Sequence, residues 1–330
     1  MSDAARRFAV AVIQGGPSSE AEVSRASATS VANALVKAGH RAVRLELDAF
    51  LSDSLRTGGY EVVFPVSHGA VGEDGSLQGL LEVLDIPYVG SDVLASALAM
   101  NKRIAKVLFA AAGLPVAPAL AAKRGDDASA LAARALAEVG SNLVVKPCSN
   151  GSAIGVARFD AGVSATDLAA AIEAAWSVDD LVLIERFAPG REITCGVLGT
   201  GADAVALPPT EIRATKDAFY TYQARYAPGR SQHLCPAPLD AAVLARVQQV
   251  AVDAHRALGC RDLSRADFVV GEVAVTLLEI NTMPGFTDTS LYPEAAGVAG
   301  IPMAELCDRF VQAAATRGAP RRNRALPLPR

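Results

Sequence analysis

The sequence predicts a mixed α/β protein of three units, α/β in its first part and α+β in the rest. Strands and helices alternate at the N-terminus, which is typical of a doubly wound parallel sheet. From Asn101 on, the pattern changes to a small unit with alanine-rich helices, and two apolar runs near the C-terminus indicate a hairpin in a larger antiparallel sheet. We expect the units to span residues 1–100, 101–188 and 189–317, followed by a disordered tail at residues 318–330.

The first unit begins with a buried strand at residues 8–13, a turn of glycine and serine, and a helix that stops at Gly39. Right-handed crossovers join successive parallel strands in such a unit. A glycine-rich loop, residues 68–75, follows the third strand, at the carboxyl end where open α/β sheets bind ligands. The other elements are expected at residues 42–47 and 61–66 (strands), 77–84 (a helix) and 87–89 (a short strand).

The second and third units contain the remaining expected elements. In the second unit these are helices at 102–112, 128–139 and 164–175 and strands at 143–146, 155–159 and 181–185. In the third they are strands at 192–198 and 204–212, a loop at 213–233, a helix at 239–258, the hairpin and a closing helix at 302–316. The loop mixes charges and aromatic residues without an apolar period, so we expect it to be a mobile lid.

Composition excludes several classes of function. Of the 330 residues, 51% are hydrophobic and 20% charged, which favours well-formed cores over a disordered chain. The net charge of −4 steers the protein neither to nucleic acid nor to an anionic membrane surface. The five cysteines are dispersed, as in a reducing compartment, and the apolar run 8–13 is too short for a signal sequence or a membrane span. We therefore expect a soluble, cytoplasmic protein.

The hairpin contains four polar side chains of interest, Arg265, Asp267, Glu279 and Asn281. Since side chains alternate along a strand, the turn decides whether they share a face. A two-residue turn would put Asp267 and Glu279 on opposite faces. A three-residue loop would put all four on one face, with those two carboxylates as diagonal neighbours about 7–8 Å apart. Oxygen ligands suit magnesium, which shares its shell with substrate phosphates. An ordinary solvated face is the alternative.

A second candidate site lies around Lys146, which ends a buried strand before the small-residue loop 149–155. Backbone N–H groups of such a loop can approach a polyphosphate, to which lysine adds a charge. The loop is not a Walker A sequence, and Gly15-Gly16 does not form the dinucleotide motif. A flexible glycine hairpin explains the loop equally well, and Lys102 by itself is an unremarkable surface lysine.

Glu185 ends a run of four apolar residues. The ordinary interpretation is a solvated acid at a strand end. The alternative is an acceptor for an adenine amino group or a ribose hydroxyl, with Glu192 nearby for the same role.

Together these residues resemble the ATP-grasp superfamily and, within it, the D-alanine–D-alanine ligases. The resemblance covers about residues 8–316. It rests on motifs that occur in the family's order: Gly15 to Ser24, His68 to Gly75, Met100-Asn101-Lys102, Lys146-Pro147, Gly151-Ser152, Leu183-Ile184-Glu185, Arg265-Ala266-Asp267 and Glu279 to Thr287.

The resemblance implies an ATP-grasp fold with a central lid domain and an enzyme that joins two D-alanines for peptidoglycan precursor synthesis. ATP phosphorylates one carboxylate, and the second amine attacks the acyl phosphate. It implies two magnesium ions, for which manganese can substitute, held by Asp267, Glu279 and Asn281. The residues implied for ATP are Lys102, Lys146, Ser152, Glu185, Arg186, Ala188, Glu192 and Arg225.

The same resemblance implies roles for the substrate residues. Glu20 would bind the ammonium of the first D-alanine beside His68. Arg265 and the N–H of Gly285 would stabilise the oxyanion of the tetrahedral intermediate. The remaining residues are Ser290 and Leu291 for the second carboxylate, and Ser152 and Tyr226, which with Glu20 would fasten the lid loops. Taken singly, Glu20 also fits a helix N-terminal acid, His68 a loop histidine and Ser290 a helix cap.

Three hypotheses remain at the level of sequence. The first is D-alanyl-D-alanine synthesis by an enzyme that the resemblance suggests is a homodimer. The second is a related ligase with another acceptor, such as D-serine, D-lactate or an antibiotic-pathway substrate; Tyr226 favours the dipeptide, since the resemblance implies that lactate-forming relatives replace this lid tyrosine. The third is a nucleotide sensor without catalysis, against which Arg265 argues because a sensor needs no oxyanion donor.

Overall fold

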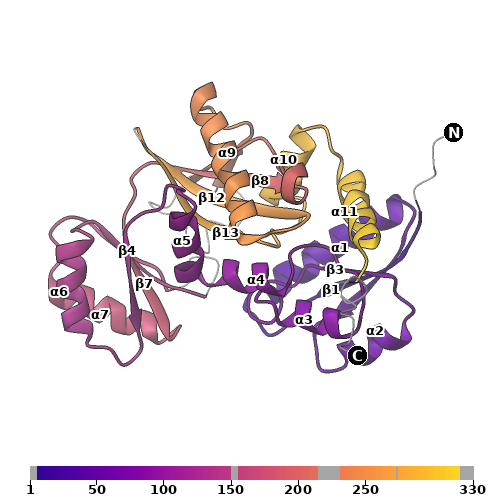
Figure 1. The fold of residues 1–330 in the computed structure, drawn as a ribbon, viewed down its shortest axis with the longest axis horizontal. Coiled ribbons are helices and arrows are strands. Elements are labelled where there is room, and N and C mark those ends of the chain that lie inside the picture. Colours follow the sequence, from indigo (N-terminus) through magenta and orange to yellow (C-terminus); the bar gives the residue numbers. More distant parts are fainter. Residues whose placement is uncertain (1–5, 150–154, 215–230, 273, 320–330) are drawn as a thin grey trace, which may run out of the picture.

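A computed structural model describes residues 6–149, 155–214, 231–272 and 274–319. These residues form three sheets in sequence order, a parallel sheet followed by two antiparallel ones, which confirms the predicted fold class. The central sheet, so called because it is the second along the chain, lies with its two helices at one end of the elongated molecule (Figure 1). The parallel sheet lies at the other end, and the third sheet lies between them. In the described part of the chain, no helix has the length and apolar character needed to cross a membrane.

The N-terminal sheet has the order β2-β1-β3, formed by Arg41–Glu46, Ala9–Gln14 and Val62–Pro65, with all pairs parallel. Helices α2 (Leu51–Thr57) and α3 (Ser76–Val83) pack on one face, as expected for a doubly wound unit. The other face is covered by α1 (Ala21–Lys37) and by α11 (Met303–Arg317). The last helix of the described chain therefore completes the core of the first unit (Figure 1).

The central sheet has the order β4-β7-β5-β6, with all pairs antiparallel. Its strands are Ala119–Lys123, Leu181–Arg186, Leu143–Pro147 and Ala157–Phe159. Helices α6 (Ala128–Glu138) and α7 (Ala165–Trp176) form one core with it, because the alanines on their buried faces allow close packing against apolar strand residues. Glu185 is the penultimate residue of β7 and is 3% exposed, so the ordinary interpretation of it as a solvated acid at a strand end is wrong.

The third sheet has the order β11-β10-β8-β12-β13, with β9 beside β8. Its core face packs on α9 (Ala241–Leu258) and on α5 (Lys102–Ala111). Although α5 lies in the segment assigned to the second unit, its Ala105 and Phe109 are buried in the core of the third. The strands, in chain order from β8 to β13, are Arg191–Leu198, Val205–Ala206, Thr210–Ala214, Ser231–Leu234, Leu263–Val270 and Val275–Asn281.

Several expected elements need correction. The single strand predicted at 204–212 is interrupted, because the consecutive prolines Pro208 and Pro209 lack the N–H groups that a ladder requires. The ends of the loop predicted at 213–233 belong to β10 and β11, and the strand expected at 87–89 is reduced to one bridge, between Val63 and Tyr88. Four elements were not predicted from the sequence: α2, β4, α4 (Val93–Met100) and α10 (Leu291–Val298).

Candidate active site

The hairpin β12–β13 brings the predicted acids together through a register that was not anticipated. Val270 pairs with Val275, so the connection is four residues long, and the predicted turns of two and three residues are both wrong. With this connection alone, Asp267 would pair with Leu278. A β-bulge between Asp267 and Phe268 shifts the register by one, so that Asp267 lies directly opposite Glu279. The two acids are direct cross-strand partners rather than diagonal neighbours.

The bulge also has a signature in the burial pattern. Leu277 and Ile280 are three apart, yet both are buried in the same core. Regular alternation would send them to opposite faces. The extra residue lets both pack inward, while Glu279 and Asn281 face outward beside Asp267 and Arg265. All four predicted residues thus share one face.

Strand β8 extends this face. Thr194 lies opposite Asp267, and Glu192 lies opposite Val269. The Thr194 hydroxyl donates to Asp267 Oδ1 at 2.7 Å. Arg265 donates to both Asp267 oxygens at 2.8 Å, from Nε and from one terminal nitrogen. Asp267 is therefore fixed from two sides, and its partner in the ion pair is Arg265.

The other two oxygen donors are also held. Lys102 Nζ lies 3.1 Å from Glu279 Oε2. The Asn281 side-chain oxygen accepts from the N–H of Met283 at 2.8 Å, which stabilises the turn after the strand. Because Lys102 is the first residue of α5 and Glu279 lies in β13, this contact links the third sheet to α5.

Two lysines and Glu185 form a buried charge cluster next to this face. Lys146 Nζ lies 2.6 Å from Glu185 Oε2, and Lys106 pairs with Oε1 of the same carboxylate. Glu279 acts electrostatically on both Lys106 and Lys146, so the two groups of charges are neighbours. Burial alone would raise the pKa of Glu185, but the cations of Lys146 and Lys106 outweigh it and keep this pKa below its ordinary value.

The N-terminal unit contributes Glu20 and His68. A Cβ built on Gly69 would lie 3.0 Å from Ser18 Cβ and 3.9 Å from Glu20 Oε2, so the loops after β1 and β3 touch. His68 is 6% exposed, and its Nδ1 lies 3.6 Å from Glu73 Oε1. Burial works to lower the pKa of His68, but Glu73 and Glu20 raise it overall, while Arg265 opposes them. Arg265 is therefore within electrostatic range of His68.

The segment after β13 lies between these parts. A Cβ on Gly285 would come within 2.9 Å of Ser290 Oγ, so glycine is needed for this close approach. Ser290 precedes α10, yet its hydroxyl accepts from the Thr287 N–H at 2.9 Å instead of capping the helix. Leu291 is the first residue of α10 and is half-buried. Phe286 N–H donates to Ser27 Oγ at 3.1 Å, which ties this segment to α1.

The remaining predicted ATP residues fall on two surfaces. Glu192 lies on the face that carries Asp267. Arg186 follows Glu185 on the opposite face of β7, where its Nε donates to the Val139 carbonyl at 2.7 Å. Its side chain therefore points away from the charge cluster, and Ala188 is half-buried just beyond the strand. Ser152, Arg225 and Tyr226 lie outside the described residues, as does most of the predicted lid.

Sequence reasoning missed three residues of this site: Lys106, Glu73 and Thr194. Lys106 lies four residues after Lys102, on the same side of α5, and this spacing was available as a signal. Glu73 lay within the glycine-rich loop that was predicted, but its pairing with His68 depends on the loop's fold. Thr194 sits in an apolar strand and gives no local signal; only the pairing of β8 with β12 reveals it.

The oxygen donors fit a hard divalent cation in their chemistry. Among the described residues, no cluster contains three or more His, Cys, Asp or Glu side chains placed to hold a metal. The candidate set has two carboxylates, Asp267 and Glu279, and the amide of Asn281. Such a set leaves coordination positions to be completed by substrate phosphates, as magnesium usually requires.

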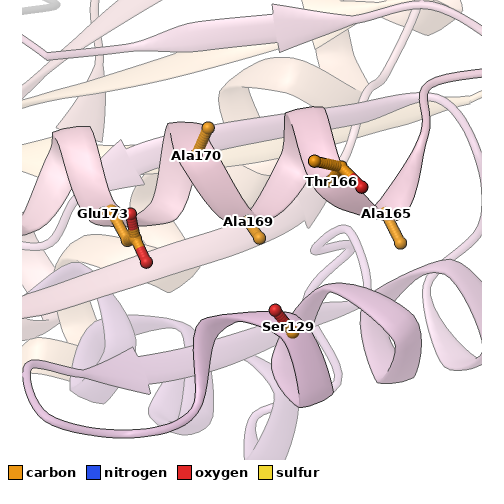
Figure 2. A pocket seen from close by; sticks show the side chains of 6 residues that line it. All are labelled: Ser129, Ala165, Thr166, Ala169, Ala170 and Glu173. Atoms are coloured by element: carbon orange, nitrogen blue, oxygen red, sulfur yellow. The ribbon is translucent and has the colours of Figure 1, made fainter.

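A separate groove lies on the outer side of the central unit. Its volume is about 300 Å³, and it is lined by three alanines of α7 and by the polar residues Ser129, Thr166 and Glu173. Figure 2 shows Ser129 pointing from α6 toward α7, and Ala165, Ala169 and Glu173 pointing from α7 toward α6. None of them belongs to the charged site described above, so we assign the groove no part in it.

Comparison with known proteins supports one family. The family model described as "D-ala D-ala ligase C-terminus" matches residues 108–312, and "D-ala D-ala ligase N-terminus" matches residues 49–91. A curated D-alanine–D-alanine ligase of Parvibaculum lavamentivorans is 44% identical over 310 residues, which is 92% of this chain and 97% of the relative.

Solved structures agree. The D-alanine–D-alanine ligase from Coxiella burnetii superposes with a TM-score of 0.83 at 29% identity and covers 96% of each chain. The Bacillus anthracis D-alanine–D-alanine ligase complexed with ATP gives a TM-score of 0.79 at 29% identity, covering 93% of this chain and 97% of that one.

Proposed function

Because this chain belongs to the D-alanine–D-alanine ligase family, we propose that the charged site described above joins two D-alanine molecules. The chain is an ADP-forming ligase that binds ATP. The observation that carries the assignment of the site is one continuous set of charges contributed by all three units. It runs from Glu185 and its lysines, through Glu279 and Asp267, to Arg265 and then His68.

The nucleotide end of this set suits ATP. Lys146 and Lys102 offer positive charge to the phosphates. Without nucleotide, Lys146 pairs with Glu185 and Lys102 pairs with Glu279. Glu185 and Glu192 offer acceptors for the adenine amino group and the ribose hydroxyls. Since the Arg186 side chain points away, we assign to Arg186 and Ala188 contacts through their main chains only.

Asp267, Glu279 and Asn281 would hold magnesium, or manganese in its place. Bound there, the metal would neutralise charge on the transferred phosphoryl group. The salt bridges of Arg265 and Lys102 hold both carboxylates in position beforehand. Removing the Glu279 charge should therefore affect turnover more than folding.

The other end suits an amino acid. Glu20 would take the ammonium of the first D-alanine, with His68 beside it. Ser290 and the N-terminal residue of α10, Leu291, would take the carboxylate of the second. The reactive carboxylate of the first substrate would then point along the set of charges toward the phosphates.

The chemistry follows from this arrangement. The first D-alanine carboxylate attacks the γ-phosphorus, which forms an acyl phosphate and releases ADP. The amine of the second D-alanine then attacks the acyl carbon, and negative charge develops on the former carbonyl oxygen. Arg265, held by Asp267, would stabilise that charge, and collapse of the intermediate expels phosphate.

The test is ADP release by the purified protein with magnesium and ATP. We expect strong stimulation by D-alanine, and little by L-alanine. Faster turnover with D-serine or D-lactate as the second substrate would replace the dipeptide assignment by the related-ligase alternative. ADP release that no D-amino acid stimulates would contradict the ligase assignment of the site. The homodimer stays a prediction, which sedimentation velocity would test.

A further inference from the structure

Lys106 is a lysine on the buried face of a helix. It lies between Ala105 and Phe109, which belong to the core of the third unit, and it is 6% exposed. A lysine is almost never buried to this degree unless it is paired. Its partner is the Glu185 carboxylate, whose side chain is 4% exposed.

Glu185 has two cations and uses one oxygen for each. Lys106 contacts Oε1, while Lys146 contacts Oε2 at 2.6 Å. Burial lowers the pKa of Lys106 in spite of Glu185, whereas the pKa of Lys146 is raised because its carboxylate neighbours outweigh burial. The two lysines thus occupy different environments around one acid.

ATP binding creates a conflict for Lys146. If Lys146 turns to a phosphate, it leaves Glu185, and a buried carboxylate without a counter-ion is strongly unfavourable. A single lysine would therefore be retained by Glu185 and withheld from the nucleotide. Lys106 removes the conflict, since it holds the other oxygen from a helix that is anchored in the core.

We propose that Lys106 is the permanent counter-ion of Glu185 and thereby releases Lys146 to bind the phosphates of ATP. The inference rests on the assignment of this site to ATP. In this role Lys106 is a positioning residue, since it acts on the nucleotide through Lys146. Helix α5 also carries Lys102, which pairs with Glu279. One helix therefore supplies a counter-ion both to Glu185, assigned to the nucleotide, and to Glu279, assigned to the metal.

The experiment is a double-mutant cycle read by calorimetric titration with ATP and magnesium. Lys106→Met removes the charge and keeps the length of the side chain. We expect it to weaken ATP binding by about 10- to 100-fold, because Glu185 then retains Lys146. In a Glu185→Gln background, where no acid needs a counter-ion, the same substitution should change ATP affinity by less than about threefold.

Two controls separate this role from simple stabilisation. Lys106→Arg keeps the charge and should restore ATP affinity to within about threefold of the wild type. The KM for D-alanine should stay within about threefold in Lys106→Met, since the substrate end of the site is untouched. If Lys106→Met does not fold, the cycle is carried out with Lys106→Gln.

Unchanged ATP affinity in Lys106→Met would overturn the proposal, as would an equal loss in the Glu185→Gln background. Because the readout is ATP binding, failure of the proposal is distinct from failure of the ligase assignment, which is read by ADP release with D-alanine.

Discussion

At the scale of single residues, the most important contact of the site is the one that the Arg265 guanidinium makes. The resemblance found in the sequence implies that it stabilises an oxyanion. In the structure its guanidinium forms a fork to Asp267, with both contacts at 2.8 Å. The guanidinium is thereby oriented before any substrate binds, and an oriented donor pays no reorganisation energy when charge develops.

We expect Arg265→Lys to lower kcat by about 100- to 1,000-fold while the KM for D-alanine changes little, because the lost donor acts on charge formed only during attack. Lysine keeps the charge but loses the fork. Thr194→Val is the matched control, since it removes the other hydrogen bond to Asp267 and leaves Arg265 in place. Equal losses of kcat in both variants would mean that Arg265 only positions Asp267.

At the scale of elements, sequence reasoning located the strands better than their pairing. The runs around 263–270 and 275–281 were visible as apolar segments, and the four polar residues were expected on one face. The bulge was not foreseeable, because it arises from the fit of Leu277 and Ile280 into the core, which no local pattern encodes. The same limitation applies to Thr194, which depends on a strand about 70 residues away.

The face of the third sheet opposite to Asp267 and Thr194 carries a separate ion cluster. Glu211 on β10 is paired with Arg191, and Arg213 donates to it at 3.0 Å. The Arg191 hydrogen bond is the main cause that lowers the pKa of Glu211 from 4.5 to about 2, against the effect of burial. A carboxyl whose pKa is lower in the folded state stabilises the protein above its unfolded pKa and loses this effect as pH falls.

We therefore expect Glu211→Gln to be less stable than the wild type at pH 7 by an amount that stays constant down to about pH 5. The difference should close as pH falls from about 4.5 toward about 2. Urea unfolding of both proteins across this range measures it. A difference that stays the same at pH 3 would show that the charge of Glu211 does not contribute.

At the scale of the whole molecule, a buried ion pair joins the first and third units. Asp262, directly before β12, receives two hydrogen bonds of 2.7 Å from Arg317 of α11 and one of 2.8 Å from the Gly90 N–H. Arg317 also donates to the Tyr88 carbonyl at 3.0 Å. Since Arg265 lies three residues after Asp262, this pair fixes its strand against the unit that carries Glu20 and His68.

Removing either partner should destabilise the protein, but not equally. Asp262 is 2% exposed, so Arg317→Met leaves a buried charge unpaired and should cost about 3–5 kcal/mol. Asp262→Asn should cost less, because asparagine tolerates the left-handed backbone at φ +61° and Arg317 can reach water. Urea unfolding at pH 7 compares the two. A larger loss in Asp262→Asn would contradict this account of the pair.

Much of the architecture was predictable, because the order of strands and helices follows from local periodicity. The contributions of α11 to the first core and of α5 to the third were not, since both pack on units distant in sequence. The motifs of the site could be recognised in the sequence. The contacts between them, such as that of Lys106 with Glu185, could not, because they depend on how the chain folds.

The central claim is that the site activates a D-alanine carboxylate by phosphorylation. The most direct measurement uses D-alanine labelled with oxygen-18 in its carboxylate and analyses the products by mass spectrometry. Our account predicts one labelled oxygen in each inorganic phosphate released, because the oxygen that attacks the γ-phosphorus leaves with it. Dipeptide formed with unlabelled phosphate, or with the label in AMP, would contradict it.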